Sequence, residues 1–280
     1  MSNILTPVSL WKNFDDTLPV QAEITGENTE DGIKTQYLSF YGRETGAGRV
    51  KIYAAFAQDT SAPADDAVIL LPDSSGSVDG ALMNFFVRRG YSVLMPDYRG
   101  KTEGAENYTV YPENVAYANY SERGRYRDFA DEDALHTSWY EWVAVAKYCY
   151  NYLKERGGVN KIGVVGLRDG GEIGWKLATI ADLACLVTVC AAGWMTYGGY
   201  HKFGGQEPQF DEERYRFIAG IDSQAYAPFV RCPVLMLCST NDERFDYDRA
   251  YDTFSRINEN YVGDSVISYS VHCNGCIDVE

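Results

Sequence analysis

The chain has 280 residues, 45% of them hydrophobic, which is enough to bury the core of one large α/β domain. A net charge of −15 disfavours nucleic acid and anionic membrane surfaces as partners, because both are themselves negative. No apolar run of about 18 residues predicts a membrane span, and Met1-Ser2-Asn3-Ile4 begins no signal-peptide pattern. The seven cysteines are an odd number, mostly in predicted strands or helices, and indicate reduced thiols in a cytoplasmic protein.

The first part of the chain predicts an irregular arm over residues 1–18 and then antiparallel strands. The expected strands cover residues 20–24, 32–42 and 49–57. Residues 35–41 alternate polar and apolar side chains, which is the period of a half-buried strand. These strands are expected at the edge of a mixed sheet.

Apolar runs then alternate with helical segments. A continuous apolar run at 67–71 predicts a strand covered on both faces, followed by a helix at 81–89 and a strand at 91–97. This alternation is typical of a parallel sheet with helices on both faces. We expect one domain over residues 1–280, with a mostly parallel, eight-stranded sheet.

The alternation of strands and helices stops at about residues 101–135. This segment is polar and rich in tyrosine, and a loop of this length inside a compact domain is usually a lid or a functional insertion. The alternative is that its tyrosines only pack the segment onto the sheet. A helix is expected again over residues 139–155.

A sharp turn between a strand and a helix follows. Ile162 to Val165 predicts a buried strand, and the residues from Gly170 predict a helix. Glycines stand two residues before and two after the central residue, as in the strained strand–turn–helix of a nucleophile elbow. The central residue is Arg168, where that pattern has serine. The frame is present and the reactive hydroxyl is missing.

Downstream, strands are expected at 185–190 and 233–238, a helix at 248–258 and a last strand at 265–271. The order of these elements resembles the α/β-hydrolase superfamily over roughly residues 35–278. Two stretches resemble dienelactone hydrolases and acetyl xylan esterase-like enzymes in particular. They are Arg231-Cys232-Pro233-Val234-Leu235, which leads to Thr240-Asn241-Asp242, and Met95-Pro96-Asp97-Tyr98-Arg99-Gly100 before the tyrosine-rich insertion.

The resemblance implies a serine nucleophile, a carboxylate and a histidine base, in that chain order. The nucleophile position falls on Arg168, whose guanidinium stays protonated and cannot attack an ester. Asp169 as nucleophile would resemble the dehalogenases, but it puts Leu167 where a small residue is needed. The acid position falls on Asp242. The base position falls on His272 or, equally, on Gly275.

The resemblance also implies an oxyanion hole made of backbone N–H groups. The donors would be an N–H within Asp73, Ser74 and Ser75 and the N–H of Asp169, the residue after the elbow. Backbone donors survive the loss of the serine, so an anion-binding site could persist. Because a buried unpaired guanidinium is costly, we expect Arg168 to pair with Asp242, or with Asp169 or Glu172.

No cofactor or metal is expected. Cys273 and Cys276 form a lone C-x-x-C beside His272, without the further ligands of a zinc site. We interpret the sequence as that of a degenerate esterase-like hydrolase, which has lost serine-dependent ester hydrolysis and whose pocket is reused to bind a small or carbohydrate-ester ligand. Two alternatives stay open: an active carboxylic-ester hydrolase with Ser74, Ser75 or Cys276 as nucleophile, and a structural module of a larger assembly.

We expect the family's final helix to be missing, because only a few residues follow the position of the base. A homo-oligomer and a fused C-terminal domain therefore both stay open as alternatives, since either would cover the face of the sheet that this helix covers in relatives.

Overall fold

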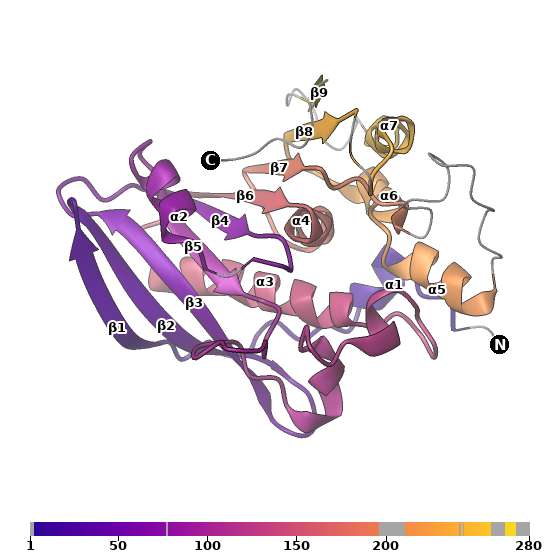
Figure 1. The fold of residues 1–280 in the computed structure, drawn as a ribbon, viewed down its shortest axis with the longest axis horizontal. Coiled ribbons are helices and arrows are strands. Elements are labelled where there is room, and N and C mark those ends of the chain that lie inside the picture. The colour runs from indigo at the N-terminus through magenta and orange to yellow at the C-terminus, as the bar shows by residue number, and fades with distance from the viewer. Residues whose placement is uncertain are drawn as a thin grey trace.

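A mixed sheet of nine strands runs through the computed structural model, which describes residues 3–76, 78–195, 211–240, 242, 244–258 and 267–272. The strand order is β1-β2-β3-β5-β4-β6-β7-β8-β9 (Figure 1). The strands are β1 (Glu23–Glu30), β2 (Ile33–Glu44), β3 (Arg49–Asp59), β4 (Asp66–Leu71), β5 (Ser92–Asp97), β6 (Lys161–Leu167), β7 (Cys185–Val189), β8 (Val234–Ser239) and β9 (Ile267–His272). Pairs β1/β2, β2/β3 and β3/β5 are antiparallel, and all later pairs are parallel. The expected count of eight strands is wrong by one.

The first strand also lies later in the chain than expected. It covers Glu23–Glu30, where the prediction was 20–24, and almost all of its side chains are exposed. A strand of this kind shows no apolar periodicity, so its pairing with β2 defines it. The connecting turn holds Asp31 at φ 48° and Gly32 at φ 78°. Both values suit a two-residue hairpin with positive φ at each central position, for which Asp-Gly is a preferred pair.

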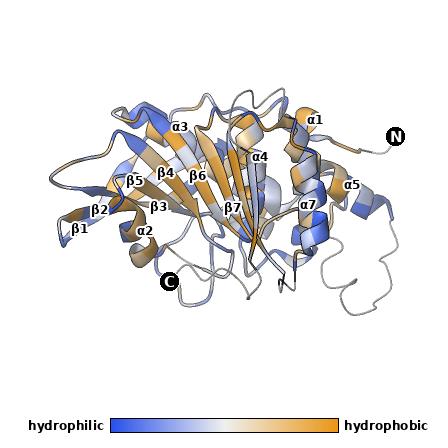
Figure 2. Ribbon diagram, turned by 90° about the horizontal axis from the view of Figure 1, so that it is seen from above, coloured by the Kyte–Doolittle hydropathy of each residue, from blue (hydrophilic) through white to orange (hydrophobic). Residues whose placement is uncertain are grey.

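Helices cover both faces of the sheet. On one face α2 (Gly80–Val87) packs Met83 and Val87 against β3, β4 and β5. On the other face α3 (Ser138–Arg156) and α4 (Asp169–Ile180) pack side by side over the larger core, and the central strands β4, β6 and β7 are apolar (Figure 2). The remaining helices are α1 (Pro7–Trp11), α5 (Glu212–Gly220), α6 (Ser223–Tyr226), η4 (Ala227–Phe229) and α7 (Tyr247–Ser255).

The N-terminal segment, expected to be irregular, contains helix α1. Thr6 and Ser9 form a capping box at its start, which satisfies backbone N–H groups that a helix leaves open. Trp11 is buried, stacks on Tyr140 at 4.8 Å between ring centroids and donates its indole N–H to the Tyr226 hydroxyl at 3.1 Å. This packing orders the helix more than its own five residues could.

The tyrosine-rich segment contains two 3-10 helices, η1 (Glu113–Ala118) and η2 (Gly124–Arg127), and it packs on α3. Two buried tryptophans of α3 hold its backbone. Trp142 donates to the carbonyl of Ala118 at 2.8 Å, and Trp139 donates to the carbonyl of Arg127 at 2.7 Å. These bonds bring η2 to the same end of the sheet as the turn between β6 and α4.

The described residues include no helix that is both long and apolar enough to cross a membrane. The five cysteines in the described ranges are free thiols. Residues 273–280 lie outside the described part of the chain, and with them Gly275, the C-x-x-C pair and the expected absence of a final helix.

Candidate functional site

The turn between β6 and α4 has the backbone of a nucleophile elbow. Arg168 sits at φ 49° and ψ −113°, a conformation that costs a non-glycine residue about 1–3 kcal/mol. A Cβ on Gly166 would come within 2.5 Å of the Gly170 carbonyl oxygen. A Cβ on Gly170 would lie 2.0 Å from the carbonyl oxygen of Leu71 at the end of β4. The glycine frame predicted from the sequence is therefore required by close backbone contacts.

Arg168 is fixed in this turn through its backbone. Its N–H donates to the carbonyl of Val189 at 2.9 Å, and its own carbonyl accepts the N–H of Glu172 at 3.0 Å. The first bond joins it to the end of β7 and the second opens α4. A guanidinium placed here has no lone pair for attack on a carbonyl carbon, because it remains protonated.

The two expected oxyanion donors meet on a carboxylate of the chain itself. Asp73 Oδ1 accepts the N–H of Ser74 at 2.9 Å and the N–H of Asp169 at 3.4 Å. Its other oxygen accepts the Ser75 hydroxyl at 2.8 Å. The loop after β4 and the elbow thus come together as the resemblance implies. Asp73 presents a negative oxygen to the amides that would otherwise face a substrate's oxyanion.

Asp169 is fully buried and joins three segments. It accepts a bond from Arg127 of η2 at 2.8 Å, a charged bond from Arg244 after β8, and the hydroxyl of Ser74. Burial by itself would raise the pKa of Asp169, but the charges of Arg244 and Arg127 hold that pKa below its usual value. Asp169 is therefore an ionised structural anchor. Both of its oxygens are engaged, which speaks against Asp169 as a nucleophile.

Two of the three carboxylates expected beside Arg168 have cationic partners of their own. Asp169 pairs with Arg127 and Arg244, while Glu172 pairs with Lys176 one turn along α4. Asp169 and Glu172 therefore each have at least one cationic partner within the described residues. The sequence could not show this, because Arg127 and Arg244 lie 42 and 75 residues away from Asp169 in the chain.

Asp242 lies in the loop after β8, at the acid position that the resemblance implies. It is only 1% exposed, so it is not a solvated loop carboxylate. Its Oδ1 accepts the N–H groups of Arg244 at 2.8 Å and Phe245 at 3.1 Å, which shapes the loop that carries Arg244 to Asp169. His272 is the last residue of β9 and pairs in register with Ser239 at the end of β8. Strands β8 and β9, which lead to the acid position and to His272, therefore end at the same edge of the sheet.

A second buried cluster, missed from the sequence, lies behind α4. Lys176 donates to the Ser223 hydroxyl at 3.2 Å, and the Ser223 hydroxyl in turn donates to Glu172. The other Glu172 oxygen accepts the N–H of Gly193 at 2.8 Å. Burial raises the pKa of the adjacent Asp222 to about 7, and the charge of Glu172 adds to the rise. The sequence feature that could have indicated this cluster is the spacing of Glu172 and Lys176, which lie four residues apart in a helix.

Asp222 should make stability depend on pH. A carboxyl group whose pKa is higher in the folded state keeps its proton after the unfolded chain has lost it, so it lowers stability as pH rises from about 4 towards 7. In that window the free energy of unfolding of the wild type should fall, relative to that of Asp222→Asn, by about 1.4 kcal/mol per pH unit. Urea denaturation from pH 4.5 to 8, with the exposed Asp65→Asn as control, measures this. A difference that is constant with pH would contradict it.

Known proteins resemble the chain in both sequence pattern and fold. Residues 52–273 match the sequence model of the dienelactone hydrolase family. No curated protein matches the sequence. Acetyl xylan esterase 1 from Thermoanaerobacterium sp. JW/SL YS485 has a similar structure, with a TM-score of 0.65 and 15% identity over 92% of this chain and 83% of that one.

Two further solved structures extend this likeness. Acetyl xylan esterase from Paenibacillus sp. R4 gives a TM-score of 0.64 at 13% identity, over 96% of this chain and 86% of that one. An esterase from Pyrococcus furiosus gives 0.56 at 16% identity, over 86% of this chain and 84% of that one. At such identities the likeness concerns the fold, and the α/β-hydrolase fold expected from the sequence is confirmed.

Proposed function

Because the chain belongs to the dienelactone hydrolase family, we propose that it is a member that has lost serine-dependent ester hydrolysis and uses the fold to bind a ligand. The observation that carries this proposal is Arg168 at the central position of the elbow, with φ 49°. The strained backbone that normally presents a nucleophile is kept, and the side chain on it cannot form an acyl intermediate.

The surroundings of Arg168 support the same proposal. A working oxyanion hole points free N–H groups at the developing negative charge, and losing one donor typically costs a factor of about 10²–10³ in kcat. Here the Asp169 and Ser74 amides bond to Asp73, and the Asp169 carboxylate is held by Arg127 and Arg244. With these two amides bonded to Asp73, the site offers little stabilisation to the oxyanion of an ester's tetrahedral state.

The other serines near the elbow are poorly placed to replace the nucleophile. Ser74 is 2% exposed and donates its hydroxyl to Asp169. Ser75 is exposed, and its hydroxyl donates to Asp73. Both hydroxyls therefore bond to aspartates, and an aspartate is a weak base for a serine proton. Cys276 lies outside the described part of the chain.

The similar acetyl xylan esterases suggest a carbohydrate ester as the ligand class, and we propose this for the elbow site. We also propose a cytoplasmic location, which the free thiols of Cys149, Cys185, Cys190, Cys232 and Cys238 support.

The test is turnover of p-nitrophenyl acetate by the purified wild-type chain. We expect its rate to equal that of heat-denatured protein at the same concentration, because surface groups alone would account for both. A catalytic rate well above that control, saturable with substrate, would overturn the proposal. Arg168→Ser is the matched variant. If the variant gains activity, only the nucleophile was lost and the rest of the relay is intact.

A further inference from the structure

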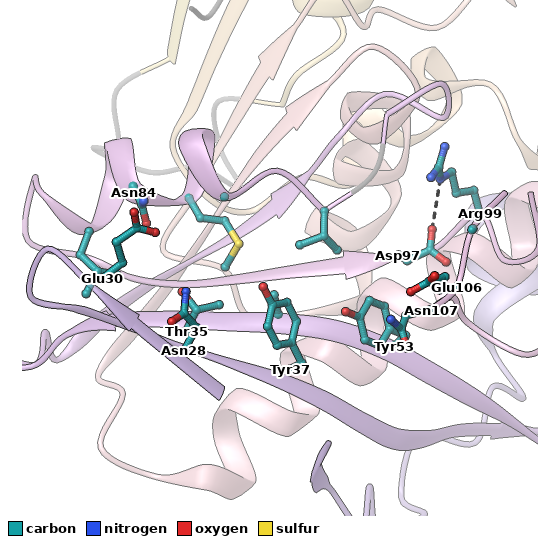
Figure 3. A pocket seen from close by; sticks show the side chains of 16 residues that line it. Asn28, Glu30, Thr35, Tyr37, Tyr53, Asn84, Asp97, Arg99, Glu106 and Asn107 are labelled. Atoms are coloured by element: carbon teal, nitrogen blue, oxygen red, sulfur yellow. Dashed lines mark hydrogen bonds and ion pairs between the residues drawn. The ribbon is translucent and has the colours of Figure 1, made fainter. Parts of the chain in front are cut away.

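A cavity of about 460 Å³ lies away from the elbow, between helix α2 and the antiparallel strands β1 to β3. Its volume is in the range of sites that take small molecules, about 300–1,000 Å³. Figure 3 shows its side chains spread from Glu30 and Asn84 at one end to Asp97 and Arg99 at the other. None of its lining residues belongs to the elbow or to residues 73–75.

The centre of the cavity is aromatic. Tyr37 of β2 and Tyr53 of β3 rise from the sheet into the space below α2 (Figure 3). Their rings are parallel, with 1° between the planes and 6.4 Å between centroids. Met83 of α2 and Ile33 of β2 add apolar surface. Flat aromatic and aliphatic groups of this kind pack well against the C–H groups of a sugar ring.

Polar groups without a protein partner among the described residues surround these rings, with Asn84 half-buried and Asn28 and Asn107 exposed at the rim. Within the described ranges, the side chains of Asn28, Asn84 and Asn107 and the hydroxyls of Tyr37 and Tyr53 make no hydrogen bond to protein. Each amide offers two donors and one acceptor, and each phenol offers one donor. Burial, with the nearby Tyr37 and Asp97, raises the pKa of Tyr53, so its hydroxyl stays protonated. The cavity therefore presents many donors and acceptors around an aromatic centre.

The charge of the lining restricts the ligand further. Glu30, Asp97 and Glu106 contribute three carboxylates against the single guanidinium of Arg99. That guanidinium is already bound to Asp97 at 3.2 Å and to the carbonyl of Ser75 at 3.4 Å. Phosphates, sugar acids and other anions are repelled by such a lining. Carboxylates accept well from hydroxyl groups, so a neutral ligand rich in hydroxyls fits.

We propose that this cavity is a binding site for a neutral carbohydrate of one or two sugar rings. Tyr37 and Tyr53 contact the C–H faces, and the asparagine amides bond neighbouring hydroxyl pairs. The elongated spread of these groups matches two linked rings better than a compact ion. The site is independent of the elbow and does not rest on the loss of ester hydrolysis.

The test is isothermal titration calorimetry of the full chain with cellobiose and maltose. We expect saturable binding of at least one of these sugars in the millimolar range or tighter. Tyr53→Phe and Asn84→Ala should each weaken it about tenfold, because each removes hydrogen bonds to the ligand worth about 1–1.5 kcal/mol. Tyr91→Phe, at an exposed ring outside the cavity, should bind as wild type. Circular dichroism checks that each variant is folded.

Several results would overturn the proposal. One is the absence of saturable binding by either sugar to a folded wild-type chain. Another is tighter binding of choline or glucuronate, titrated in the same way, because the cavity would then be a site for ions. A third is sugar binding that both cavity variants leave unchanged, because the ligand would then sit elsewhere. Ester turnover is measured separately, so failure here leaves the proposal for the elbow standing.

Discussion

Asp169→Asn is expected to lower the free energy of unfolding by about 2–4 kcal/mol. The change removes the charge from a fully buried carboxylate and leaves Arg127 and Arg244 without their shared partner. Breaking a buried pair by removing one partner costs about 3–5 kcal/mol, and a smaller loss is expected here because both guanidinium groups are partly exposed and can reach water. Equilibrium urea denaturation at pH 7 measures the loss.

The same variant should loosen the insertion. Asp169 holds η2 to the elbow through Arg127, so we expect trypsin to cut faster after Arg123, Arg125 and Arg127. Asp128→Asn is the matched control, because Asp128 is an exposed carboxylate 4.0 Å from the same Arg127. It should change stability by less than about 0.5 kcal/mol. Equal effects of the two changes would mean that Asp169 does not anchor the segment.

Gly170→Ala is expected to cost more than about 4 kcal/mol or to prevent folding. The added Cβ would lie 2.0 Å from the Leu71 carbonyl oxygen and 2.5 Å from that of Pro72. Both are backbone atoms at the end of β4, so the clash can be relieved only by moving the strand end away from α4. Thermal denaturation and the yield of soluble protein report the effect.

Gly80→Ala provides the comparison for this change. Gly80 is the first residue of α2, and a Cβ there meets no atom within 4 Å. Alanine loses less conformational entropy on folding, so stability should be unchanged or higher by about 0.5–1 kcal/mol. A folded Gly170→Ala variant with the melting temperature of wild type would show that the elbow is not closely packed against β4.

Local signals were enough to predict the elbow. Its apolar strand, its glycine frame and the following helix are all within residues 162–180, and close contacts in the structure explain each glycine. The alternation of strands and helices likewise predicted the parallel part of the sheet. These features are set by short-range periodicity and by backbone sterics, which the sequence carries directly.

The position predicted for strand β1 is wrong because the sequence feature that locates this strand is in the turn that follows it. Its residues are polar and exposed, and they gain strand structure from backbone pairing with β2. The Asp31-Gly32 pair, with positive φ at both residues, was the feature that could have located the hairpin.

The anchors around Asp169 could not be predicted for a different reason. Arg127 and Arg244 come from an insertion and a loop whose positions depend on tertiary packing by Trp139 and Asp242. Ion pairs between residues this far apart follow no spacing rule. The hydrogen bonds from the oxyanion donors to Asp73 could not be predicted for the same reason. The sequence predicts which loop supplies the donors, but it does not predict the orientation of the Asp73 side chain.

The central claim is that no serine of this chain becomes acylated, and intact-protein mass spectrometry after exposure to a fluorophosphonate tests it without a choice of substrate. An active serine esterase in the same reaction confirms that the reagent is competent. We predict that the mass of the wild-type chain stays unchanged, because Arg168 occupies the position of the nucleophile. A stoichiometric adduct would contradict the account, and peptide mapping of the adduct to Ser74, Ser75 or another serine would identify the nucleophile.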